Sequence, residues 1–81
     1  MNISVQFIGK HRTETGSDSI TIPLDKVKSV SDVLRKIKKW HPHISISESA
    51  VIATVNDEIA KMSTVLRADD RVSFLPVVGG G

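Results

Sequence analysis

One stretch of this sequence has the periodicity of an amphipathic helix, and it lies between segments that alternate like strands. Apolar residues recur there at three- and four-residue spacing, at Val30, Val33, Leu34, Ile37 and, as the expected last member, Trp40. We expect a helix from about Ser31 to Trp40, with Ser31 as its N-cap and His41-Pro42 after its end. A lone helix must bury its apolar face against a sheet. The sequence therefore predicts a two-layer α+β fold.

Strand-like patterns flank the helix on both sides. Residues 2–8 and 19–24 alternate apolar and polar side chains, and the polar stretch 9–17 between them is expected to be a hairpin connection. Pro23 indicates that the second strand lies at a sheet edge or ends there. Beyond the helix, residues 51–55 and 71–75 are predicted strands.

A shorter strand completes the predicted sheet. Residues 58–61 follow the turn Asn56-Asp57 and are expected to return beside residues 51–55. With one crossing helix in so short a chain, this order predicts a β-grasp (ubiquitin-like) fold. We expect a mixed sheet of four to five strands with one main helix on one face. A single domain, 1–76, would be followed by a flexible tail, 77–81.

Composition and spacing exclude several kinds of chemistry. The sequence has no cysteine, which removes disulfides, thiolate metal sites and a thiol nucleophile. His11, His41 and His43 are expected in loops or at a helix end, and they complete neither a metal site nor a catalytic triad. No apolar run approaches the roughly 18 residues of a membrane span, and no signal-peptide pattern is present. We therefore expect a cytoplasmic protein without a metal or a membrane contact.

Basic side chains gather on and just before the helix, at Lys26, Lys28, Arg35, Lys36, Lys38 and Lys39. The net charge of +2 is mild. Nucleic-acid binding would require interleaved aromatic residues or a known module. We therefore interpret this surface as a solvated face, with Trp40 at the edge of the core and no nucleic acid as a partner.

The chain ends in an unusual tail, Val77-Val78-Gly79-Gly80-Gly81, that continues directly from the last strand and Pro76. Five extended residues reach about 18 Å, enough to carry the terminal carboxylate into the narrow active site of a partner. Glycines let the backbone pass where a Cβ atom would clash. Composition alone leaves a frayed end open as an alternative, but the strand leading into the tail favours a function.

Three apolar residues are out of place in the strand pattern. Ile8 falls on the polar side of the first strand, Leu75 lies opposite Phe74, and Ile59 follows the Asn56-Asp57 turn. If the first and last strands are neighbours, Ile8 and Leu75 form one exposed apolar patch near the tail.

Three segments carry a resemblance to a known family. They are the stretch Ile52–Asn56, the turn Ala68–Asp70 and the ending Val72–Gly81. They resemble the MoaD/ThiS family of ubiquitin-like sulfur carriers, and the Phe-Leu-Pro approach to the tail is most similar to the MoaD branch. The similarity covers the whole chain in length and element order and is sharpest from Val51 onward.

The resemblance implies a carrier without catalytic activity or a bound cofactor of its own. An E1-like adenylyltransferase (MoeB-like) would use ATP to convert the Gly81 carboxylate to an adenylate, and a sulfur donor system would convert it to a thiocarboxylate. Gly80 would provide clearance. Gly79 departs from the family pattern, so it adds flexibility or marks a terminus that is trimmed.

The resemblance also implies where partners bind. In the family, the activating enzyme and the large catalytic subunit of molybdopterin synthase (MoaE-like) dock on one surface. Here that surface would comprise Ile8, Ile59, Leu75, Pro76, Val77 and Val78.

Three other functions stay open at this point. The first is a sulfur carrier of the thiamine pathway (ThiS-like), and the second is a ubiquitin-like modifier that forms isopeptide bonds with lysines. The third is a passive protein-binding module. The first two need the same activated glycine end, so the sequence does not separate them from the molybdopterin reading.

Overall fold

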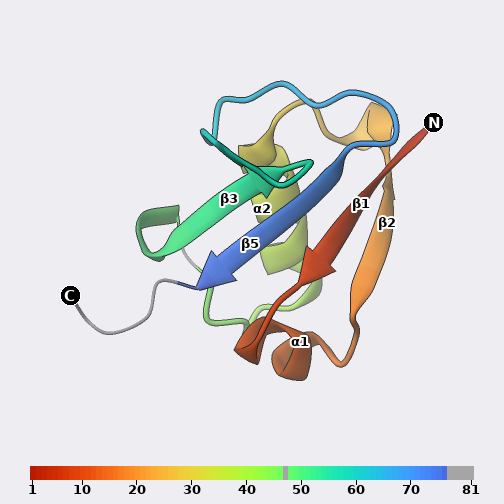
Figure 1. Cartoon of the computed structure of the whole chain (residues 1–81). Helices are drawn as coiled ribbons and strands as arrows, with labels where there is room; N and C mark the ends of the chain where they lie inside the picture. The colour runs from red at the N-terminus through yellow and green to blue at the C-terminus, as the bar shows by residue number, and fades with distance from the viewer. Residues whose placement is uncertain (47, 77–81) are drawn as a thin grey trace.

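The computed structural model describes residues 1–46 and 48–76, and these form a sheet with a helix packed behind it (Figure 1). The elements are β1 (Asn2–Phe7), α1 (Lys10–Thr15), β2 (Ser19–Pro23), η1 (Leu24–Lys26), α2 (Val30–Trp40), η2 (Glu48–Ala50), β3 (Val51–Val55), β4 (Glu58–Ala60) and β5 (Arg71–Pro76), where η marks a short 3₁₀ helix. In the described residues the strands form one five-stranded sheet. This arrangement is the β-grasp fold, as predicted.

The strand order β2-β1-β5-β3-β4 places the two ends of the described chain at the centre of the sheet. β1 and β5 run parallel, with Val5 beside Val72 and Phe7 beside Phe74, and the remaining neighbours are antiparallel. The expectation that the first and last strands are neighbours is therefore confirmed. β2 lies at an edge, which agrees with the position of Pro23.

Helix α2 covers one face of the sheet, and no helix of the described residues covers the other face, which is toward the viewer in Figure 1. The helix begins one residue earlier than predicted, because Ser29 and not Ser31 is the N-cap. Asp32 accepts hydrogen bonds at Oδ2 from the backbone N–H groups of Ser29 (3.2 Å) and Lys28 (2.9 Å), which completes a capping box.

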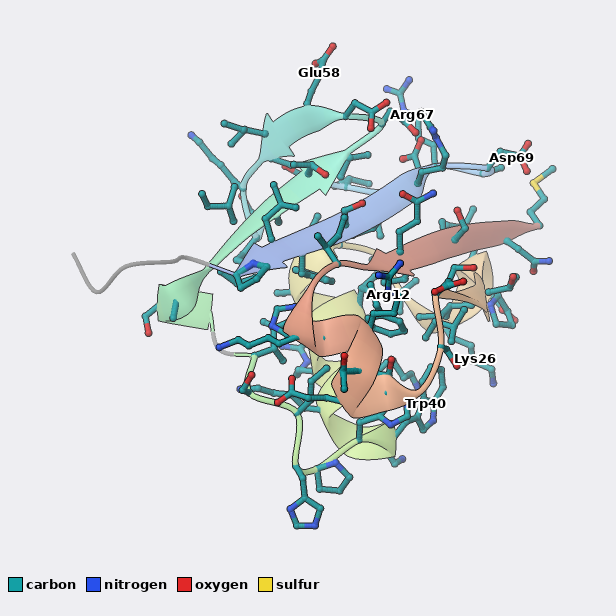
Figure 2. All side chains as sticks on the ribbon, turned by 60° about the horizontal axis from the view of Figure 1, so that its bottom comes forward. Arg12, Lys26, Trp40, Glu58, Arg67 and Asp69 are labelled. Carbon is teal, nitrogen blue, oxygen red and sulfur yellow. The ribbon has the colours of Figure 1, made fainter. Side chains whose placement is uncertain are left out.

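The core lies between α2 and the sheet. The side chain of Phe74 is 1% exposed, and it packs in one cluster with apolar residues from β1, β2 and α2, among them Ile3, Val5, Ile22, Val33, Leu34 and Ile37. Trp40, which was expected at the edge of the core, belongs neither to this cluster nor to the partly buried residues that pack against it. Trp40 is 48% exposed, because it is the last residue of α2 and stays at the surface where the chain leaves the helix (Figure 2).

The predicted hairpin connection 9–17 is also wrong in one respect, because it contains the helix α1. Two glycines with positive φ delimit this helix: Gly9 (58°) precedes it, and Gly16 (72°) ends it in the left-handed conformation that favours glycine. His11 was expected in a loop, but it lies in α1 and is 1% exposed.

Candidate functional site

The candidate site begins at the end of β5, where the described chain stops. Pro76 is the last described residue, is half-buried and pairs with Val51 of β3. Two residues earlier, Phe74 is fixed in the core. The tail residues named from the sequence, Val77, Val78, Gly79, Gly80 and Gly81, lie outside the described residues. Any tail that continues from Pro76 therefore starts from an anchored strand.

Beside this strand end, apolar side chains lie on the uncovered face of the sheet. Alternation along β5 turns Leu75 away from the buried Phe74, and register places Ile52 of β3 directly opposite Leu75. The last pair between β1 and β5 is Phe7 with Phe74, and Ile8 and Leu75 are the residues that follow this pair on the two chains. Ile59 of β4 lies opposite Thr54 on the same face. We call Ile8, Ile52, Ile59 and Leu75 the open-face patch.

Exposure shows that the open-face patch is accessible. Ile59 is 81% exposed, Ile52 is 40% and Ile8 is 39%, while Leu75 is half-buried between its neighbours. Apolar side chains gathered on one sheet face, as opposed to scattered singly, are typical of a surface that meets another protein. The chain thus offers an accessible apolar area beside the strand end from which its tail continues.

Ile52 was not among the candidate residues named from the sequence. It lies in the run Val51–Val55, which consists mostly of β-branched residues, so hydrophobicity alone does not show which side chains face the core. The buried residue of this strand is Ala53, and the exposed Ile52 is its neighbour. The small residue Ala53 faces the core and the larger Ile52 faces away from it. This assignment of faces can be made only when the register with β5 is known.

Helix α1 lies at the same end of the sheet as the terminus of β5 (Figure 1). Glu14 ties it to the segment after α2, because its carboxylate accepts hydrogen bonds from the Ser45 backbone N–H (3.2 Å) and from Ser45 Oγ (3.0 Å). Partial desolvation raises the pKa of Glu14, but the hydrogen bonds from Ser45 and the nearby basic side chains together outweigh it, so the net pKa lies below the ordinary value.

The basic side chains lie on α2 and the turn before it, on the helix-covered side of the sheet. Lys26, Asp32, Arg35, Lys36 and Lys39 line a shallow surface depression of about 250 Å³. Asp32 pairs with Arg35, and its pKa is lowered chiefly by the backbone N–H groups of Lys28 and Ser29. Figure 2 labels Lys26 at this surface. The interpretation as a solvated face stays a prediction.

The described residues offer neither a metal site nor a membrane-spanning helix. In residues 1–46 and 48–76, no three histidine, aspartate or glutamate side chains come together in a way that would hold a metal ion. None of the helices described there is long and apolar enough to cross a membrane. The features that stand out are thus the end of β5 and the open-face patch.

Known structures share this fold over nearly the whole chain. SAMP1 from Haloferax volcanii, described as small archaeal modifier protein 1, is 19% identical, with a TM-score of 0.81 over 100% of both chains. A putative molybdopterin converting factor, subunit 1, from Pyrococcus furiosus is 24% identical, with a TM-score of 0.81 over 96% of this chain and 99% of that one.

A third similar structure was solved as a complex. In the protein-protein complex of subunits 1 and 2 of the molybdopterin-converting factor from Helicobacter pylori, the matching chain is 23% identical, with a TM-score of 0.67 over 100% of both chains. At these identities the likeness shows the shared fold. No curated protein matched the sequence.

The fold is that of the ubiquitin-like β-grasp class, and its last strand leads to a glycine end. The family model of the ThiS family matches residues 5–81, nearly the whole chain. The chain therefore belongs to the ThiS family of small ubiquitin-like sulfur carriers, which confirms the resemblance seen in the sequence.

Proposed function

We propose that this chain carries sulfur on its terminal glycine for molybdopterin biosynthesis, as the small subunit of a molybdopterin synthase. One observation carries the proposal: β5 runs from the buried Phe74 past the open-face patch to Pro76, from which the glycine tail continues. A partner that covers the patch is thereby aligned with the tail. Family membership supports the sulfur chemistry.

The chemistry begins with activation of the Gly81 carboxylate. One carboxylate oxygen attacks the α-phosphorus of ATP, a mixed anhydride with AMP forms, and pyrophosphate leaves. This step is needed because a carboxylate is a poor electrophile until one of its oxygens belongs to a good leaving group. We assign ATP binding to an E1-like adenylyltransferase, so the chain itself serves as a substrate and binds no cofactor.

Sulfur transfer follows from the adenylate. A sulfide-level sulfur nucleophile from a donor system attacks the glycyl carbonyl carbon, the C–O bond to AMP breaks, and a thiocarboxylate remains at Gly81. The thiocarboxylate is a nucleophile, and the tail presents it to a large catalytic subunit (MoaE-like) of the synthase. A tail of this reach, about 18 Å when extended, enters a site that the domain is too wide to enter.

The open-face patch is the proposed docking surface for both partners. Ile8, Ile59 and Leu75 were named from the sequence, and the register adds Ile52. Both partners must reach the same glycine, so one shared surface makes their binding mutually exclusive. A carrier with this surface is handed from the activating enzyme to the synthase by dissociation and rebinding.

The molybdopterin assignment is supported by the similar structures from Pyrococcus furiosus and Helicobacter pylori, whose names refer to molybdopterin conversion. The likeness to SAMP1 favours a second candidate, a modifier whose Gly81 forms an isopeptide bond with lysines of target proteins. Both functions begin with the same adenylate. They differ in whether sulfur or a lysine amine displaces AMP.

A tail deletion tests the proposal against a passive binding module. Removal of Gly80 and Gly81 is expected to abolish ATP–pyrophosphate exchange by the activating enzyme, while the circular dichroism spectrum and the thermal midpoint stay those of the full chain. Unchanged exchange without the two glycines would contradict the proposal. Lysine conjugates in cell extract, absent from the deletion variant, would favour the modifier.

A further inference from the structure

His11 is a buried titratable residue that the proposed chemistry does not use. It belongs to α1, its side chain is 1% exposed, and its Nδ1 lies 3.4 Å from the backbone carbonyl oxygen of Phe74. Phe74 is two residues before the end of β5 and 63 residues from His11 in the sequence. A histidine of α1 thus contacts β5 near the end of the strand that leads to the tail.

The end of β5 has different neighbours on its two sides. Pairing with β3 continues to Pro76, which is opposite Val51, whereas pairing with β1 stops at Phe74, opposite Phe7. The chain turns away after β1 and forms α1. A Cβ atom placed on Gly9 would lie 4.0 Å from Pro76 Cγ, so the start of α1 flanks the last residues of β5. The start of α1 therefore lies beside the last residues of β5, on the edge of β5 where β1 no longer pairs with it.

α1 is itself fixed to the rest of the domain. Glu14 accepts hydrogen bonds from Ser45, on the segment after α2. At the same end of the sheet, the ring of Phe7 meets His41 edge to face, with ring centroids 6.5 Å apart. The segment after α2 thus supports α1, the helix that carries His11.

We propose that His11 is a positioning residue, which holds the end of β5 and thereby sets the direction in which the tail leaves the domain. A carbonyl oxygen only accepts hydrogen bonds, so the contact requires a proton on Nδ1. The Phe74 carbonyl oxygen accepts this bond at the point where the pairing of β1 with β5 ends. Neutral His11 is then the Nδ1–H tautomer.

The inference rests on the proposed function, because a positioned tail matters only if a partner must receive it. A strand end held in one direction reduces the conformational entropy that is lost when the tail enters a narrow site. One lost hydrogen bond of ordinary net strength corresponds to a loss of about two- to ten-fold in kcat/KM for adenylation. The loss is expected mainly as a higher KM, since His11 touches no reacting atom.

Two substitutions separate positioning from packing. His11→Leu fills the space but has no donor, whereas His11→Asn retains an N–H group near the position of Nδ1. The exposed His43→Leu is the matched control. Each variant is assayed for kcat and KM of pyrophosphate exchange, and amide hydrogen exchange is compared at Leu75, on the strand end, and at Val5, in the core.

The tautomer of the wild-type chain is measured in parallel by ¹⁵N NMR of the imidazole, which does not depend on any partner. We expect the Nδ1–H tautomer, faster exchange at Leu75 but not at Val5 in His11→Leu, and partial recovery of KM in His11→Asn. An Nε2–H tautomer, or equal changes at Leu75 and Val5, would overturn the proposal, as would an unchanged KM in a folded His11→Leu variant.

The same experiment keeps this inference apart from the proposed function. If His11→Leu does not fold, the wild-type tautomer and the His11→Asn kinetics decide. A third outcome is that the wild-type chain has the Nδ1–H tautomer and His11→Leu speeds exchange at Leu75 only, but the wild-type chain is never adenylated. In that case the proposed function is wrong, and the contact of His11 with β5 is still supported.

Discussion

Ile52 and Leu75 are cross-strand partners on β3 and β5, and they lie on the sheet face that no described helix covers. Their pairing places two apolar side chains beside Pro76, the last described residue before the glycine tail. Cross-strand apolar neighbours of this kind stabilise a sheet only modestly. The position of the pair next to the tail suggests that its main role is contact with another protein.

Ile52→Lys is expected to weaken binding of the activating enzyme and the large synthase subunit by about ten-fold or more, as loss of a central apolar contact does. The change buries no charge in the free chain, because Ile52 is 40% exposed. Stability is expected to change by less than about 1 kcal/mol. Calorimetric titration and thermal unfolding measure the two effects.

The matched control is Thr21→Lys, which adds the same charge on the same face at the distant edge strand β2, where Thr21 is exposed and opposite Ser4. Binding of both partners is expected to survive this change. Equal losses for the two lysine variants would mean that general charge, and not the open-face patch, controls docking.

Asn56 is expected to be the most sensitive polar residue of the β3–β4 turn. It has φ of 52°, its Oδ1 accepts from the Arg71 N–H (3.0 Å), and its Nδ2 donates to Asp70 Oδ1 (2.9 Å). Asn56→Ala is expected to lower the free energy of unfolding by about 1–3 kcal/mol. Asn56→Gly removes the same hydrogen bonds but adopts positive φ without strain, so its free energy of unfolding should fall less. Urea unfolding of this variant therefore measures the contribution of the side-chain hydrogen bonds alone. A loss no larger for Ala than for Gly would contradict this account.

Asp32 predicts a stability that decreases in acid. Backbone N–H groups of Lys28 and Ser29, and then Arg35, lower its pKa in the folded state, so the unfolded state binds the proton more readily. The contribution is complete above the unfolded value, about 3.9, and is lost as the pH falls below it toward the folded pKa. Urea midpoints at pH 7 and pH 3 should differ less in Asp32→Asn than in the wild-type chain. An identical pH dependence in both would be the contrary result.

Glycines of the tail are expected to differ in their tolerance of a Cβ atom. Gly80→Ala should lower kcat/KM for adenylation by about ten-fold or more, because a backbone in a narrow site has no room for the methyl group. Gly79→Ala should have a smaller effect if the third glycine only adds flexibility. Pyrophosphate-exchange kinetics measure both, and thermal unfolding should be unchanged. Equal sensitivity at the two positions would assign Gly79 to the narrow site as well.

The fold was predictable because its strongest signals are periodic. Alternation over residues 2–8 and 71–75 and the helical spacing of Val30, Val33 and Ile37 fixed the layers, and Pro23 indicated an edge strand. The pairing of β1 with β5 was expected from the same order of elements. These features depend on apolar and polar residues that alternate over several positions, and such a pattern is visible in the sequence itself.

The parts that were missed depend on single residues. α1 contains the sequence Lys-His-Arg-Thr-Glu-Thr, which has no aliphatic residue, and its one buried side chain is His11, which has no periodic partner. Gly16 at its C-terminal end was the available signal. Ile52 was missed because the face of a β-branched strand is decided by its register with β5, a long-range contact.

The measurement that tests the central claim most directly is the intact mass of the chain after incubation with the activating enzyme, ATP and a sulfur donor. We predict a mass gain equal to the replacement of one oxygen atom by sulfur, located by fragmentation at Gly81. Treatment with a thiol-alkylating reagent should add the mass of one alkyl group to this species, because it converts the thiocarboxylate to its thioester. A chain that becomes adenylated yet never exchanges oxygen for sulfur, or that gains sulfur at any other residue, would contradict the account.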